Sequence, residues 1–294
     1  MSKTYLFLFF TAMTAILSQA QTGVQQLKEK IKARINNQGT VAVAFRDLSS
    51  EEEILINEQE VFHAASTMKT PVLIEVFKQA KQGKFALKDS IVIKNEFKSI
   101  VDGSLYSLNP SDDSEQKMYS LIGQKKTLMD LVNDMIIYSS NLATNIIIEL
   151  VGAQNVMKTM RELGANSIQV LRGVEDSKAF EKGLNNTTTA RDLLIIFEAI
   201  AKGKTVSPGS SQQMIEILLH QQFNKVIPAR LPATVKVAHK TGSITGILHD
   251  SGIVFLPDGH MYILVLLSKG VGSEEAATDL LAGISEMIYQ YVVR

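Results

Sequence analysis

Residues 62–69 of this chain read Phe-His-Ala-Ala-Ser-Thr-Met-Lys, and we expect the fold to be organised around them. Ser66 and Lys69 are three residues apart, so their side chains face the same side of a helix. An amphipathic run over 71–80 follows, which predicts that Ser66 lies in the first helical turn, at the positive end of the dipole. A serine hydroxyl becomes a good nucleophile when a base removes its proton, and a neutral amine can be that base. A capping serine followed by an exposed lysine gives the same letters, so the pattern alone is a weak indicator.

Two later stretches strengthen this interpretation. Ser139-Ser140-Asn141 lies between two helical runs, and Lys240-Thr241-Gly242 ends an apolar, strand-like run over 235–238. Motifs of the types S-x-x-K, S-D-N and K-T-G are found together in class A β-lactamases and penicillin-binding proteins. The chain therefore resembles these serine hydrolases, over about residues 25–290.

Composition excludes several other classes of protein. The 294 residues are 45% hydrophobic, which is enough for a sizeable core. Thirty basic and 30 acidic residues give a net charge of zero, and no basic cluster stands out, so we expect no nucleic-acid partner. The chain has no Cys, and its five His residues lack metal-ligand spacing. We therefore expect no disulfide, no metal and no other cofactor.

The beginning of the chain reads as a signal peptide over residues 1–20. Lys3 supplies a positive charge, an apolar run covers 5–17, and Ser18-Gln19-Ala20 offers small residues for cleavage. The apolar run is short for a membrane span, although an uncleaved anchor is the alternative. We expect a mature chain that begins at Gln21, is periplasmic or secreted by a bacterium, and has no membrane association after cleavage.

Hydrophobic periodicity predicts strands near both ends of the chain and helices between them. Alternating or continuous apolar runs predict strands at 41–45, 53–56, 235–241, 252–256 and 261–267. Helical periods and capping residues predict helices at 24–35, 127–138, 142–151, 156–163, 190–201, 207–219 and 274–292. The continuous apolar run over 262–267 indicates a buried central strand.

This order of elements predicts an α/β (α+β) fold with an antiparallel sheet flanked by helices and a separate all-α lobe, similar to the β-lactamase and transpeptidase fold. We expect the sheet lobe to come from about 21–65 and 205–294, and the helical lobe from about 66–204. A cleft between the lobes would take residues from both, as ligand sites at domain interfaces do.

The resemblance assigns catalytic roles to four residues. Ser66 would be the nucleophile, and Lys69 would assist removal of its proton, directly or together with a glutamate through water. Ser139 would pass a proton to the leaving nitrogen, and Lys240 would place a cation beside the nucleophile.

The resemblance also implies a set of substrate-binding groups. Asn141 would hydrogen-bond the side-chain amide of the substrate, and Thr241 would bind its carboxylate. The backbone N–H of Ser243 would complete an oxyanion hole with that of Ser66. Gly242 would let the ligand approach the strand closely.

Three positions depart from the family pattern or need interpretation. Ser140 stands where the pattern has Asp, so we expect a slightly less rigid loop, because a serine caps a turn more weakly. Asn145, at the end of the same motif, is expected to hold a neighbouring loop through its amide. Ser251 stands where many relatives have an arginine for the substrate carboxylate, so we expect a different anion contact; Arg230 is one candidate, although an exposed loop arginine fits it as well.

The glutamate that activates water for deacylation is the least defined residue. Glu181 matches the family's E-x-x-L-N pattern literally, through Leu184 and Asn185. Glu175 fits better by position, because it comes three residues after Arg172. We favour Glu175, and Glu181 stays open as the alternative.

The activity that the resemblance implies is hydrolysis of β-lactams through an acyl-enzyme on Ser66. The alternatives are a penicillin-binding D-alanyl-D-alanine peptidase or another serine hydrolase with slow deacylation, and a non-catalytic sensor of β-lactams or wall peptides. We expect a monomer that acts on a small-molecule β-lactam.

Overall fold

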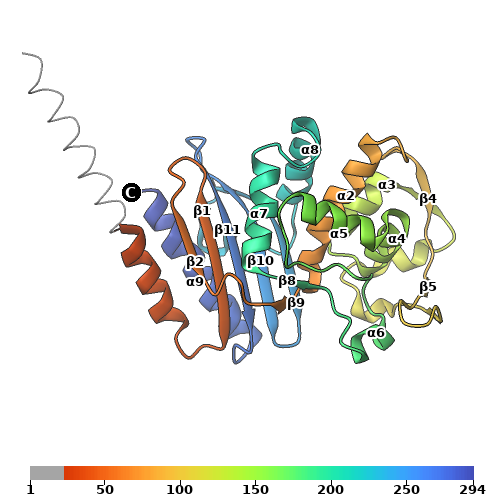
Figure 1. Ribbon diagram of the computed structural model, residues 1–294, viewed down its shortest axis with the longest axis horizontal. Coiled ribbons are helices and arrows are strands. Elements are labelled where there is room, and N and C mark those ends of the chain that lie inside the picture. The colour runs from red at the N-terminus through yellow and green to blue at the C-terminus, as the bar shows by residue number, and fades with distance from the viewer. Residues whose placement is uncertain (1–22) are drawn as a thin grey trace, which may run out of the picture.

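The computed structural model describes residues 23–294, and the signal peptide predicted at 1–20 and the mature end predicted at Gln21 lie outside them. The described chain forms a five-stranded antiparallel sheet with helices on both faces and a group of helices beyond one face (Figure 1). The predicted α+β class is confirmed.

The sheet has the strand order β2-β1-β11-β10-β9. Its strands are β1 (Thr40–Asp47), β2 (Glu53–Ile56), β9 (Lys236–Ile244), β10 (Ile247–Phe255) and β11 (Met261–Lys269). All neighbouring strands are antiparallel, with Val43 opposite Leu266 and Ser251 opposite Lys240. The apolar strand β11 lies in the centre, as predicted, and β9 forms an edge. The motif at 240–242 is therefore on an edge strand, where one side is open to a ligand.

Side-chain alternation along the strands separates two hydrophobic cores. Val43 and Phe45 face the helix over 23–35 and the C-terminal helix α9 (Glu274–Val292), which lie together on one side of the sheet in Figure 1. Ala42 and Ala44 face the opposite side, where α7 (Ala190–Ala201) packs on the sheet.

The second core continues from the sheet into the helical part of the molecule. Its helices are α2 (Lys69–Lys81), α3 (Leu128–Ile137), α4 (Asn141–Val151), α5 (Ala153–Glu162) and α8 (Pro208–Leu219), with the short α6 (Ser177–Glu181) nearby. A capping box is present at the start of α3, with Thr127 accepting from the backbone nitrogen of Asp130. Helix α7 packs on the sheet, although it falls within the predicted helical lobe at 66–204. The boundary between the two lobes stays a prediction.

Short elements connect these layers. They are β3 (Phe62–His63) with β8 (Thr187–Thr188), β4 (Ser90–Val92) with β7 (Lys125–Thr127), β5 (Phe97–Lys98) with β6 (Leu105–Tyr106), and the 3-10 turns η1 (Ala65–Met68), η2 (Pro110–Asp112), η3 (Gln116–Leu121) and η4 (Pro228–Arg230). The segment between β4 and α3 contains only such short elements.

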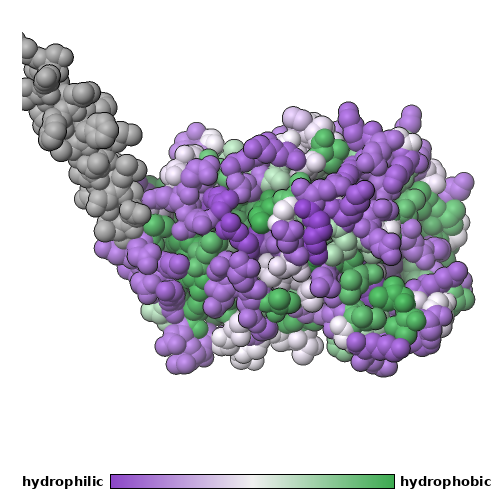
Figure 2. Space-filling model, viewed as in Figure 1, coloured by the Kyte–Doolittle hydropathy of each residue, from purple (hydrophilic) through white to green (hydrophobic). Residues whose placement is uncertain are grey.

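The face of the molecule in Figure 2 is mainly hydrophilic, with apolar patches over β1 and β2 and near α6 and β5. None of the helices within residues 23–294 combines the length and the apolar character that crossing a membrane requires.

Candidate active site

A cavity of about 1060 Å³ lies where the sheet edge meets the helical part of the molecule. Ser66, Ser139, Asn141, Glu175 and Thr241 all line it, although they come from four separate stretches of the chain. A second cavity, of about 800 Å³, is lined by residues 80 and 83–89 and contains none of these side chains. The larger cavity is therefore the candidate active site.

Ser66 lies in the 3-10 turn η1, which runs directly into α2 at Lys69. The sequence thus places it in the first helical turn, as predicted. Ala65, just before it, has the unfavourable φ of 46°, and strained backbone of this kind clusters at functional sites. A Cβ atom on Gly242 would lie 3.0 Å from the backbone nitrogen of Ser66, so the absence of a side chain lets β9 approach this turn.

Lys69 is fully buried beside the cavity. Its Nζ donates to the Ser139 carbonyl at 2.7 Å and contacts Ser139 Oγ at 3.2 Å and Asn141 Oδ1 at 3.1 Å. Burial lowers the pKa of Lys69 to about 7, against the opposing effect of the negative charges on Asp113 and Glu175. A large share of this amine is therefore neutral near pH 7 and able to accept a proton.

Lys240 is the second buried cation of the site. Its Nζ donates to Ser139 Oγ at 3.1 Å and to the Thr241 carbonyl at 2.9 Å. Burial, and then the neighbouring charge of Lys69, lower the pKa of Lys240. The Ser139 hydroxyl therefore lies between two amines, and it can receive a proton from one side while donating one into the cavity.

The amide of Asn141 joins the two candidate bases. Its Oδ1 contacts Lys69 Nζ at 3.1 Å, and its Nδ2 donates to Glu175 Oε1 at 2.8 Å. Thr241, Gly242 and Ser243 line the same cavity from the end of β9.

The structure separates the two candidate glutamates. Glu175 lines the cavity, and burial is the main cause that raises the pKa of its carboxyl, against the hydrogen bond from Asn141. Glu181 is exposed at the end of α6 and does not line the cavity. The geometry therefore favours Glu175, the residue chosen by position, over the literal motif match.

Comparison with known proteins agrees with this arrangement. A family profile described as "Beta-lactamase enzyme family" matches residues 26–292. The chain belongs to the β-lactamase enzyme family. It is 23% identical to β-lactamase VEB-1 of Pseudomonas aeruginosa, over 97% of this chain and 94% of that protein.

Two solved structures are similar to this member of the β-lactamase family over most of its length. The β-lactamase of Sphaerobacter thermophilus is 25% identical with a TM-score of 0.79, covering 93% of this chain and 98% of its own. PBP-A is 26% identical with a TM-score of 0.78, covering 91% of this chain and 96% of its own. The similarity thus extends to a β-lactamase and to a protein named PBP-A at nearly equal levels.

The loop that carries Glu175 is held by individual polar side chains. Asn145 accepts from the Val174 nitrogen at 2.6 Å and donates to the Val174 carbonyl at 3.1 Å, so it holds this loop as predicted. A Cβ on Gly173 would lie 2.2 Å from Asn145 Oδ1, which explains the glycine. The buried Arg172 donates to the Leu184 carbonyl at 2.9 Å and therefore supports the loop from within.

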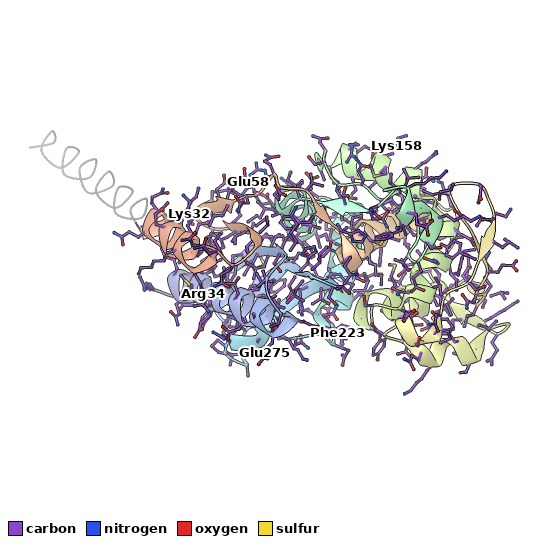
Figure 3. All side chains as sticks on the ribbon, turned by 90° about the horizontal axis from the view of Figure 1, so that it is seen from below. Lys32, Arg34, Glu58, Lys158, Phe223 and Glu275 are labelled. Atoms are coloured by element: carbon purple, nitrogen blue, oxygen red, sulfur yellow. The ribbon has the colours of Figure 1, made fainter. Side chains whose placement is uncertain are left out.

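Of the residues considered for the substrate carboxylate, Thr241 lines the cavity, whereas Arg230 and Ser251 do not. Ser251 is fully buried and donates to the Lys240 carbonyl at 3.3 Å. Arg230 pairs with Asp279 and Glu286 on α9 and does not line the cavity. Lys225, which the sequence did not single out, is exposed and lines the cavity. Phe223 lines it too, and Figure 3 places it at the surface between the sheet and the helical part.

The loop at Ser140 is bound by a carboxylate from another part of the chain. Asp113, which is 4% exposed, accepts from the backbone nitrogens of Asn141 and Leu142 at 2.9 Å each and from Ser140 Oγ at 3.3 Å. Ser140 Oγ itself accepts from the Ala143 nitrogen at 3.2 Å as the N-cap of α4. A carboxylate from elsewhere in the chain therefore binds this loop, while the smaller rigidity expected from Ser140 stays a prediction.

The described residues contain no group of three or more His, Asp or Glu side chains arranged to bind a metal ion.

Proposed function

We propose that this protein is an exported class A serine β-lactamase that opens the β-lactam amide through an acyl-enzyme on Ser66. One observation carries the proposal: the Glu175 carboxylate lines the same cavity as Ser66 and is linked through Asn141 to Lys69. The site thus offers one base for making the ester and a second base for hydrolysing it.

In the acylation step, neutral Lys69 accepts the proton of Ser66 Oγ as that oxygen attacks the lactam carbonyl. The N–H groups of Ser66 and Ser243 stabilise the oxyanion, and Ser139 gives its proton to the departing lactam nitrogen. The two buried amines on either side of Ser139 can restore that proton.

In the deacylation step, Glu175 accepts a proton from a water molecule that attacks the ester carbonyl. The bond to Ser66 Oγ breaks, and this oxygen regains a proton. A positioned general base contributes about 10²–10⁴-fold to such a step, so the role of Glu175 decides whether the ester turns over.

A penicillin-binding D-alanyl-D-alanine peptidase is the second candidate. It is favoured by the similarity to PBP-A, of which a mutant structure at 25% identity and TM-score 0.76 is an acyl-enzyme complex with penicillin G. Such a protein shares the acylation residues and differs in the lifetime of the ester.

Intact-mass spectrometry of the mature wild type with benzylpenicillin separates these functions. We expect free enzyme within seconds and rapid hydrolysis of a chromogenic cephalosporin. An adduct that persists for many minutes supports the peptidase. If the wild type forms no adduct and hydrolyses no substrate, both candidate functions are refuted.

The proposal includes a mature chain that begins at Gln21, is periplasmic or secreted, and acts as a monomer on a small-molecule β-lactam without nucleic-acid or membrane partners. N-terminal sequencing of the exported protein and its elution volume in size-exclusion chromatography test these points. A protein that begins at Met1 and stays in the membrane pellet would refute the predicted cleavage.

A further inference from the structure

We propose that Asp113 is the positioning residue of the acylation centre, supplying from a distant loop the carboxylate that the S-x-N motif lacks at Ser140. This inference rests on the proposed function, because it concerns acylation of Ser66. Asp113 and Ser140 are 27 residues apart in the chain, and no local motif connects them.

Asp113 is buried and accepts hydrogen bonds from several backbone and side-chain groups. Its side chain is 4% exposed and follows directly after η2. Oδ2 accepts from two backbone nitrogens, those of Asn141 and Leu142, at the first turn of α4. It also accepts from Tyr119 Oη at 3.0 Å and Ser140 Oγ at 3.3 Å, while Oδ1 accepts from the Glu115 nitrogen at 3.0 Å. A carboxylate is favoured at this helix end, because the unpaired N–H groups and the dipole are positive there.

The anchored segment is the one that holds the catalytic amine. Asn141, whose nitrogen is bound by Asp113, contacts Lys69 and Glu175 through its own side chain. The residue before Ser140 is Ser139, whose carbonyl accepts from Lys69 at 2.7 Å. Ser139 also has a φ of 59°, a conformation that persists only when its surroundings hold it. Asp113 thus fixes the backbone on which Lys69 depends.

Asp113 also acts on Lys69 by its charge. The charged groups that act on Lys69 are Asp113, Glu175 and Lys240, and the Asp113 carboxylate raises the pKa of Lys69. Removal of this one negative charge should lower the pKa of Lys69, so the amine becomes neutral at a lower pH. A residue with a purely structural role would not move the pH profile in this direction.

The first test is Asp113→Asn in the mature protein, with single-turnover acylation by a fluorescent penicillin measured against pH. We expect the acylation rate at pH 8 to fall about 10- to 100-fold, because loss of positioning by about 1 Å has effects of this size. We also expect the acid limb of the profile to move to lower pH. Asp130→Asn is the matched control, since Asp130 is an exposed carboxylate that caps α3, and it should leave both the rate and the limb unchanged.

The second test moves the carboxylate to the place where the motif would have it. Ser140→Asp alone places two carboxylates about a hydrogen bond apart, so acylation should fall by a similar factor. Combining it with Asp113→Ser exchanges the two side chains, and we expect most of the wild-type acylation rate to return. This exchange remains decisive if either single variant fails to fold, since the double variant should then recover both folding and acylation.

The results separate the inference from the proposed function. A wild type that is not acylated refutes the proposed function. A wild type that is acylated, with Asp113→Asn equal to it in rate and pH profile, refutes the role of Asp113. A double variant no better than its single variants also refutes it, because the position of the carboxylate would then not be what matters.

Discussion

The two halves of this active site are built in different ways. Ser66, Lys69, Ser139 and Lys240 lie on or beside regular elements, and the two lysines are fully buried. Glu175 lies instead on a loop over 172–186 whose regular structure is the short α6, and hydrogen bonds that involve the side chains of Asn145, Arg172 and Asp176 hold this loop.

This difference coincides with the two steps of the proposed reaction. In the proposed function, the residues assigned to acylation lie on packed helices and an edge strand. The residue proposed for deacylation lies on a loop that polar contacts hold, and loops vary more readily than packed elements. The loop, more than the acylation centre, should decide which activity a member of this family has.

The largest effect should come from the rigid half. Ser66→Ala should lower hydrolysis of a chromogenic cephalosporin on the order of 10⁶-fold, the scale found when another serine hydrolase loses its nucleophile. Ser66 is only partly buried, so we expect the melting temperature to change by less than about 2 °C. Turnover well above background in this variant would contradict a serine mechanism.

The next effect tests the loop. Glu175→Gln keeps the shape and the bond to Asn141 but loses the base, so deacylation should slow about 10²–10⁴-fold. Intact-mass spectrometry with benzylpenicillin should then show a lasting adduct, formed at nearly the wild-type rate. Glu181→Gln is the matched control, because Glu181 is exposed outside the cavity, and it should release the adduct like the wild type. If Glu181→Gln traps the adduct and Glu175→Gln does not, the assignment of the loop is wrong.

The two halves should also respond differently to pH. Lys69 must be neutral to accept a proton, and its pKa is about 7, so the acylation rate should rise about tenfold per unit below pH 7 and level off above it. Glu175 must be ionised to act as a base, and burial raises its pKa above that of an ordinary glutamate. The deacylation rate should therefore fall at a lower pH than the acylation rate does, but above the ordinary pKa of a glutamate. Stopped-flow acylation and adduct decay, measured separately, test this order. Coincident limbs for the two steps would show that one group governs both.

The same contrast describes what the sequence could predict. Local patterns sufficed for the strands of the sheet, for the helix that begins near Thr127 and for the buried strand β11, because each depends on neighbouring residues. The three motifs also indicated candidate site residues that the fold brings to or beside one cavity. Sequence spacing could not decide between Glu175 and Glu181, since the loop conformation depends on distant contacts. Asp113 was missed for the same reason, because its partners at 140–142 lie 27 to 29 positions away.

The smallest effect should come from the wall of the cavity at Lys225, which belongs neither to the acylation residues nor to the Glu175 loop. With Ser251 buried and Arg230 paired on α9, the exposed Lys225 is the side chain we expect to attract the substrate carboxylate. Lys225→Ala should therefore raise KM for benzylpenicillin only about two- to fivefold and leave kcat almost unchanged, since exposed charge pairs contribute about 0–1 kcal/mol. The effect should shrink as salt is raised, because exposed charges are screened over about 10 Å at 0.1 M ionic strength. Arg230→Ala is the control and should leave KM unchanged. A fall in kcat, or a rise in KM that salt does not reduce, would mean that Lys225 supports the cavity wall and that the carboxylate is bound by neutral groups at the end of β9.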